Sequence, residues 1–199
     1  MSTGLFMGIR SSFVDEAQDS AIAFVEAIND ELAKRGITRY VDSTDPPDVY
    51  KGHLFGRSEL DHHSSRVLVD IASFATTLRE CENLALIQHN PFRVAFLPRD
   101  FSPPLLTGYF ERIGGEPIQI RAGSLPRLMA ELSSIAAVLG IPMANGILTD
   151  DVATAINTFE GLDEGDSAEL SEDQRTAWLV LYEGTRLALE HSVALSLAG

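Results

Sequence analysis

The sequence has little of what would mark a secreted or membrane-spanning protein. Its 199 residues include one cysteine, Cys81, so no disulfide can form within the chain. Residues 1–10 lack the basic segment and apolar run of a secretory signal. No stretch approaches the roughly 18 consecutive apolar residues of a membrane-spanning helix. We therefore expect a cytoplasmic protein that does not enter a membrane.

Basic residues are also scarce, and their scarcity is uneven. The chain has 15 Lys and Arg against 29 Asp and Glu, a formal charge of −14. Residues 150–199 hold eleven of the acidic residues but only two basic ones, Arg175 and Arg186. A surface of this sign repels the phosphates of a nucleic acid. We therefore expect no direct binding of DNA or RNA.

The strongest charge feature is the acidic span, residues 160–173, which has seven acidic residues and no basic one. Clustered like charge can steer a partner of opposite charge and raise its association rate. The alternative is a solvated linker before the last helix. As partner-binding residues of this span the sequence suggests Glu160, Asp163, Glu164, Asp166 and Glu169.

Hydrophobic periodicity predicts the elements of the fold. Helices are expected over about 14–34, 64–79, 124–139, 149–158 and from 171 nearly to the end, and strands over 5–9, 37–41 and 118–120. Residues 84–87 and 93–97 are either two strands joined by a tight turn or irregular pieces. The expected class is α/β or α+β: a small central sheet with packed helices and a mainly helical C-terminal region. We expect one domain over 1–199, in which 1–148 and 149–199 could form two lobes.

Sites for nucleophilic catalysis and phosphate binding have little support. No serine lies between glycines in the five-residue pattern of a nucleophile elbow, and Gly114-Gly115 lacks the lysine of a nucleotide-binding loop. Cys81 is flanked by Glu80 and Glu82, and carboxylates disfavour the reactive thiolate. We therefore expect no cofactor and a binding protein rather than an enzyme.

One cluster could hold a metal ion: His53, Glu59, Asp61, His62 and His63. Imidazole and carboxylate groups suit zinc, iron or manganese. However, side chains adjacent in sequence diverge by about 100° on a helix and lie on opposite faces of a strand. We therefore expect a polar loop and helix cap with no metal. A small metal-assisted hydrolase using Glu59, Asp61, His62 and His63 is the alternative.

A proline-rich segment, residues 96–106, could form a second recognition surface. Stiff backbone and a rigid aromatic side chain lower the entropic cost of binding. As partner-binding residues this segment offers Arg99, Asp100 and Phe101. The alternative is a strand exit in which Phe101 and Leu105 enter the core.

Together these features predict an acidic binding protein that engages a basic protein partner. The natural class by charge is an immunity or antitoxin protein that neutralises a toxin. Besides the hydrolase, a second alternative is an α/β domain that binds a small ligand at the carboxyl ends of its strands, near 97–101 or at Gly123-Ser124.

Overall fold

The computed structural model describes residues 4–10, 18–42, 81–89, 93–110, 118–158 and 172–198. Within these ranges it contains a five-stranded mixed sheet and five helices, which confirms the expected fold class as α+β. The elements are β1 (Gly4–Met7), α1 (Gln18–Lys34), α3 (Glu82–His89), β2 (Arg93–Leu97), β3 (Leu105–Phe110), β4 (Ile118–Ser124), α4 (Leu125–Ala136), α5 (Asp150–Thr158), α6 (Glu172–Glu190) and β5 (Leu195–Ala198). No described helix is long and apolar enough to cross a membrane.

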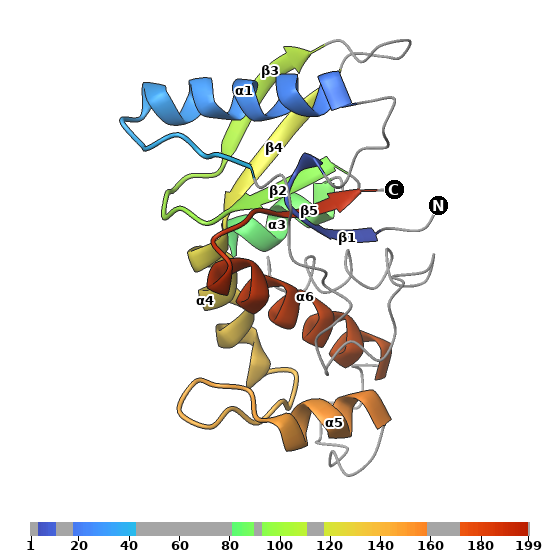
Figure 1. Cartoon of the computed structure of the whole chain (residues 1–199). Coiled ribbons are helices and arrows are strands. Elements are labelled where there is room, and N and C mark those ends of the chain that lie inside the picture. Colours follow the sequence, from blue (N-terminus) through green and yellow to red (C-terminus); the bar gives the residue numbers. More distant parts are fainter. Residues whose placement is uncertain are drawn as a thin grey trace.

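The strand order of the sheet is β1-β5-β2-β4-β3. Strands β2 and β4 are parallel, and every other neighbouring pair is antiparallel. The last strand, β5, therefore lies between β1 and β2, near the middle of the sheet (Figure 1). Residues from the two ends of the chain are thus joined inside one sheet.

Helices cover both faces of the sheet (Figure 1). On one face α1 packs through Phe24, Val25, Ile28 and Leu32 against a core that includes Ala95 and Leu97 of β2. On the other face α3, α4 and α6 enclose a larger core that includes Val94 and Phe96 of the same strand. Strand β2 is therefore buried on both sides, because successive side chains of a strand point to opposite faces. Helix α5 packs on α6, away from the sheet.

The predicted apolar stripe of α4 is confirmed. Leu128, Leu132, Ile135 and Leu139 are all buried. Ser124 caps the helix at its N-terminus, and Gly140 with a φ of 66° follows its last turn. The indole Nε1 of Trp178 in α6 donates to the carbonyl of Leu132 at 2.9 Å, which joins the two helices.

Two short segments differ from the sequence-based prediction. Residues 84–87, predicted as a strand or an irregular piece, belong to helix α3. Residues 37–41, predicted as a strand, form no strand. There the side chain of Asn29 replaces a neighbouring strand, because its amide donates to the Tyr40 carbonyl at 2.9 Å and accepts from the Tyr40 N–H at 2.7 Å. The predicted helix over 64–79 lies outside the described residues.

The C-terminal region is also less helical than predicted. Helix α6 ends at Glu190, Ser192 takes a φ of 55°, and the chain then enters β5. The N–H of Val193 donates to the carbonyl of Ala188 at 3.0 Å, which closes the helix end. Strand β3, which follows the prolines at 103 and 104, was not predicted either.

Candidate functional site

Most of the residues predicted to bind a partner fall outside the described residues. This holds for Glu160, Asp163, Glu164, Asp166 and Glu169, which lie between α5 and α6 in sequence. It also holds for the possible metal cluster, His53, Glu59, Asp61, His62 and His63. The roles predicted for both groups therefore remain predictions. Within the described part of the chain, no three His, Cys, Asp or Glu side chains are grouped so that they could hold a metal ion.

The loop between β2 and β3, residues 98–104, carries the three described residues of the predicted site. Phe101 is only 5% exposed and packs in the core beneath α1, so its ring does not reach the surface. Asp100 is exposed, and its Oδ1 pairs with the Nε of Arg127 at 2.7 Å. Arg99 is half-buried and donates to the carbonyl of Pro98 at 2.8 Å. Of the three, Asp100 and Arg99 have side chains that a partner could reach.

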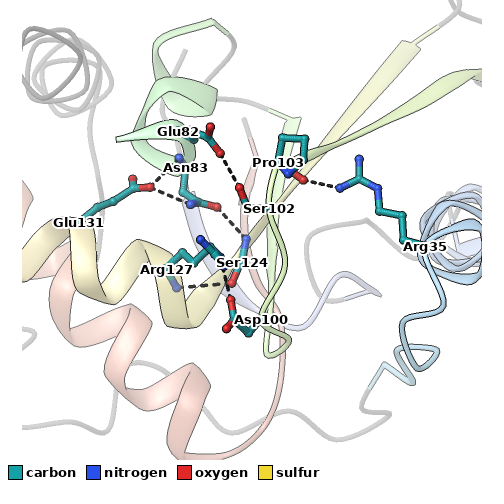
Figure 2. A network of polar contacts seen from close by, with 9 residues as sticks. All are labelled: Arg35, Glu82, Asn83, Asp100, Ser102, Pro103, Ser124, Arg127 and Glu131. Atoms are coloured by element: carbon teal, nitrogen blue, oxygen red, sulfur yellow. Dashed lines mark hydrogen bonds and ion pairs between the residues drawn. The ribbon is translucent and has the colours of Figure 1, made fainter. Parts of the chain in front are cut away.

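Contacts from α3, from α4 and from the residue that follows α1 fix this loop (Figure 2). From α4, Arg127 holds Asp100. From α3, the Glu82 carboxylate accepts a hydrogen bond from the Ser102 hydroxyl at 3.0 Å. Just beyond the end of α1, Arg35 donates to the carbonyls of Pro103 and Pro104. The loop is therefore ordered before any partner arrives, which lowers the entropic cost of binding.

Beneath the loop a buried polar network joins α3, α4 and the end of β4 (Figure 2). The Glu131 carboxylate accepts from the backbone N–H of Asn83 at 3.0 Å, from its side-chain amide at 2.8 Å and from the Leu84 N–H at 2.8 Å. The Asn83 Oδ1 accepts from the Ser124 N–H at 2.8 Å. Side chains thus satisfy the first N–H groups of α3, and the N–H at the start of α4 is also taken. At Gly123-Ser124, predicted as a possible ligand site, the Ser124 N–H donates to Asn83 and the Ser124 hydroxyl accepts from the Arg127 N–H.

The buried position of Glu131 in this network predicts that the stability of the protein depends on pH. Burial raises the pKa of the Glu131 carboxyl, and the hydrogen bonds from Asn83 and Leu84 oppose this only in part. A carboxyl whose pKa is raised on folding stabilises the protein fully below its unfolded pKa, and this contribution is lost as the pH rises through the folded pKa. We expect the free energy of unfolding of the wild type, relative to Glu131→Gln, to fall as the pH rises from about 4.

Urea unfolding of both proteins at a series of pH values measures this difference. The glutamine side chain has the shape of glutamate but does not titrate. Any effect of its amide group on the free energy of unfolding is therefore the same at every pH. If the free energy of unfolding of the wild type relative to Glu131→Gln is constant, or grows with pH, the raised pKa of Glu131 is contradicted.

Exposed carboxylates gather on two helices of the described structure. On α1, Asp19, Glu26 and Asp30 are exposed and share one face, because they are spaced by seven and four residues. At the start of α5, Asp150 and Asp151 are both exposed. Glu26 pairs with Arg39 at 2.6 Å, whereas among the described residues no ion pair engages the other four carboxylates.

The two basic residues of the C-terminal quarter are turned inward or occupied. The Arg175 Nε donates to the Leu139 carbonyl at 3.3 Å. Arg186 pairs with Glu183 at 2.9 Å and with Glu190 at 3.0 Å. Among the described residues, neither arginine forms an ion pair with the exposed Asp150 or Asp151 at the start of α5.

The sequence-based prediction overlooked the carboxylates of α1 and α5. The signal for α1 was present, because Asp19, Glu26 and Asp30 fall on the face opposite the buried stripe of Phe24 and Ile28. For α5, Asp150 and Asp151 were counted in the charge of residues 150–199 but were not named as site residues. The predicted site residues came instead mainly from the acidic span, residues 160–173, which follows α5 in the sequence.

Comparisons with known proteins give one match. No curated protein and no solved structure is significantly similar to this chain. One family model, described as "Putative DNA-mimic protein", matches residues 53–197, well over half of the chain. This finding overturns the predicted immunity or antitoxin function, and it supports neither the metal-assisted hydrolase nor the small-ligand domain. An acidic protein that binds another protein agrees with this description, and the chain belongs to the family that the model describes.

Proposed function

We propose that this chain acts as a DNA mimic that occupies the DNA-binding surface of a DNA-binding protein. Its carboxylates would take the places that phosphates take in the DNA complex. The partner surface is cationic, because proteins neutralise the phosphates of DNA with Lys and Arg. The chain would itself bind no nucleic acid. Like its partner, it would act in the cytoplasm.

The observation that carries this proposal is the position of the charge within the matched residues. The match extends to residue 197 and so includes nearly all of the C-terminal quarter, which contains eleven acidic and two basic residues. Both arginines there are engaged by the protein itself, whereas Asp150 and Asp151 are exposed without an ion pair among the described residues. Such a surface offers a partner anionic groups that are not held in ion pairs within the described part of the chain.

A competition experiment tests the proposal. Proteins of the native cell are first retained on a double-stranded DNA column, eluted with salt, and passed over the immobilised chain. We expect at least one DNA-binding protein to be retained and then displaced by duplex DNA. Added chain should also release that protein from a labelled duplex in a gel-shift assay. Polyglutamate at equal charge concentration controls for unspecific attraction to anions.

Mutual exclusion is the decisive result, because a mimic and DNA need the same surface. A ternary complex of the chain, the captured protein and DNA would contradict mimicry. Mimicry would also be contradicted if polyglutamate released the captured protein from DNA as effectively as the chain does. If no DNA-binding protein is retained at all, the proposed function is wrong.

A further inference from the structure

The connection between α4 and α5 presents a large apolar side chain to solvent. Ile147 is 64% exposed, and among the large hydrophobic residues that the structure describes as exposed Val41, at 82%, is more exposed. Single exposed apolar residues are common on protein surfaces and need no explanation by themselves. Ile147 differs because its backbone is fixed by hydrogen bonds and because two exposed carboxylates, Asp150 and Asp151, follow it closely in the chain.

A tight two-residue turn holds Ile147 in place. The N–H of Ala144 donates to the carbonyl of Ile147 at 2.9 Å, and the N–H of Ile147 donates to the carbonyl of Ala144 at 3.0 Å. Between them Asn145 and Gly146 have φ values of 54° and 78°. Two successive left-handed residues of the Asn-Gly type form the rigid turn of a two-residue hairpin. The position of Ile147 is thus set before binding.

The residues around the turn are anchored in the core, so Ile147 cannot fold inward. Ile141 and Leu148 are buried in the cluster that contains Trp178 and Tyr182. The N–H of Leu148 also lies 3.5 Å from the Tyr182 hydroxyl. Because Leu148 occupies the inward position, the neighbouring side chain of Ile147 is directed outward.

Two carboxylates follow the exposed isoleucine at the start of α5. Asp150 and Asp151 lie three and four residues after Ile147, and both are exposed. Within the described part of the chain neither forms an ion pair, and the two arginines of the C-terminal quarter are engaged elsewhere. An apolar contact and two uncompensated anions therefore lie on one short stretch of chain, which we call the α4–α5 tip: residues 144–151.

We propose that the α4–α5 tip docks on a DNA-binding protein at a point where its phosphate-binding cations border an apolar hollow. This inference rests on the proposed function. Duplex DNA offers the same combination, since the thymine methyl group in the major groove lies beside the phosphates and is contacted by apolar side chains. Asp150 and Asp151 face the cations, and Ile147 fills the hollow.

The apolar contact gives the mimic a basis for choosing among cationic proteins. Charge attracts every basic surface and mainly raises the rate of encounter. Burying an isoleucine side chain strengthens binding only where the partner provides a complementary hollow, and corresponds to roughly 10- to 100-fold in Kd. Because this contribution does not come from charge, it persists at salt concentrations that screen the carboxylates.

The test compares Ile147→Ser with the matched control Ile22→Ser. Ile22 is 44% exposed and lies on α1, at the opposite end of the molecule from α5 (Figure 1). The probe is the purified DNA-binding protein that duplex DNA displaced from the immobilised chain, and Kd is measured from about 0.05 to 0.5 M salt. We expect Ile147→Ser to raise Kd at least tenfold with an unchanged salt dependence. Ile22→Ser should bind as the wild type does, and Asp150→Asn with Asp151→Asn should flatten the salt dependence.

Each outcome separates this inference from the proposed function. If Ile147→Ser binds as tightly as the wild type while DNA still competes, the α4–α5 tip is not the docking point and DNA mimicry stands. If Ile147→Ser instead abolishes self-association of the chain in sedimentation, the side chain serves contact between copies and the inference is overturned. Retention of no DNA-binding protein overturns both. Equal melting temperatures of wild type and variants show that a change in Kd is not a loss of folding.

Discussion

Reversal of Asp163, Glu164 and Asp166 to lysine is expected to slow association with the DNA-binding partner by about 100-fold at ~0.05 M salt. Electrostatic attraction raises association rates by roughly 10- to 1000-fold, and the acidic span is the densest run of charge in the chain. Each reversal adds two charges, so the formal charge falls in magnitude from −14 to −8. Dissociation should change less, because it depends mainly on short-range contacts.

Stopped-flow or surface-based kinetics at two salt concentrations measure this effect. Between ~0.05 and ~0.5 M salt the Debye length shortens from about 14 to about 4 Å, so the difference between variant and wild type should shrink. Reversal of Asp19, Glu26 and Asp30 on α1 is the matched control, because α1 lies outside the matched residues 53–197 and at the end of the molecule opposite α5 (Figure 1), and the reversal changes the net charge equally. Equal slowing by both variants would mean that net charge acts rather than the acidic span.

Gly123→Ala should cost about 3 kcal/mol of stability, near the upper end for one added methyl group in a packed interior. A Cβ atom at this position would lie 2.6 Å from the Phe96 Cδ1 and 2.7 Å from the Asn83 Oδ1. Neither neighbour is free to move. Phe96 is fully buried, and Asn83 is bound to both Glu131 and Ser124. The strain would therefore spread through the network that joins α3, α4 and β4 (Figure 2).

Chemical denaturation of Gly123→Ala beside Gly36→Ala checks this expectation. At Gly36 no atom lies within 4 Å of an added Cβ, and only the φ of 68° opposes alanine. That substitution should cost about 1 kcal/mol. If both variants lose the same stability, small shifts of the neighbouring groups accommodate the added methyl group at Gly123, and the contact between β4 and α3 is looser than the structure has it.

Long periodic segments were predictable from sequence because many residues agree on one pattern. The stripe of Leu128, Leu132, Ile135 and Leu139 predicted α4 and its buried face, and Ser124 and Gly140 marked its ends. Short segments were not predictable, since four apolar residues fit a strand and a helix equally well. For residues 84–87 the choice between strand and helix depends on Glu131, whose carboxylate accepts hydrogen bonds from the N–H groups of Asn83 and Leu84. These two residues lie 48 and 47 positions away from Glu131 along the chain.

For function, too, some features could be predicted from the sequence and others required the structure. Charge counted from the sequence predicted a protein partner of opposite charge, but charge alone does not distinguish an antitoxin from a DNA mimic. From the sequence Phe101 could be an exposed aromatic or a core residue, and its burial in the core beneath α1 decided between the two. Ile147 could not be singled out without the buried Leu148 beside it.

What the sequence by itself determined is therefore the acidic surplus, its concentration after residue 150, the lack of any internal disulfide, and the long amphipathic helices. These follow from composition and local periodicity, which need no knowledge of distant residues. Only the tertiary structure decided that Leu195–Ala198 is a strand, because this segment is held between β1 and β2 by hydrogen bonds to both. It also decided which side chains stay exposed, since exposure depends on what the rest of the chain covers.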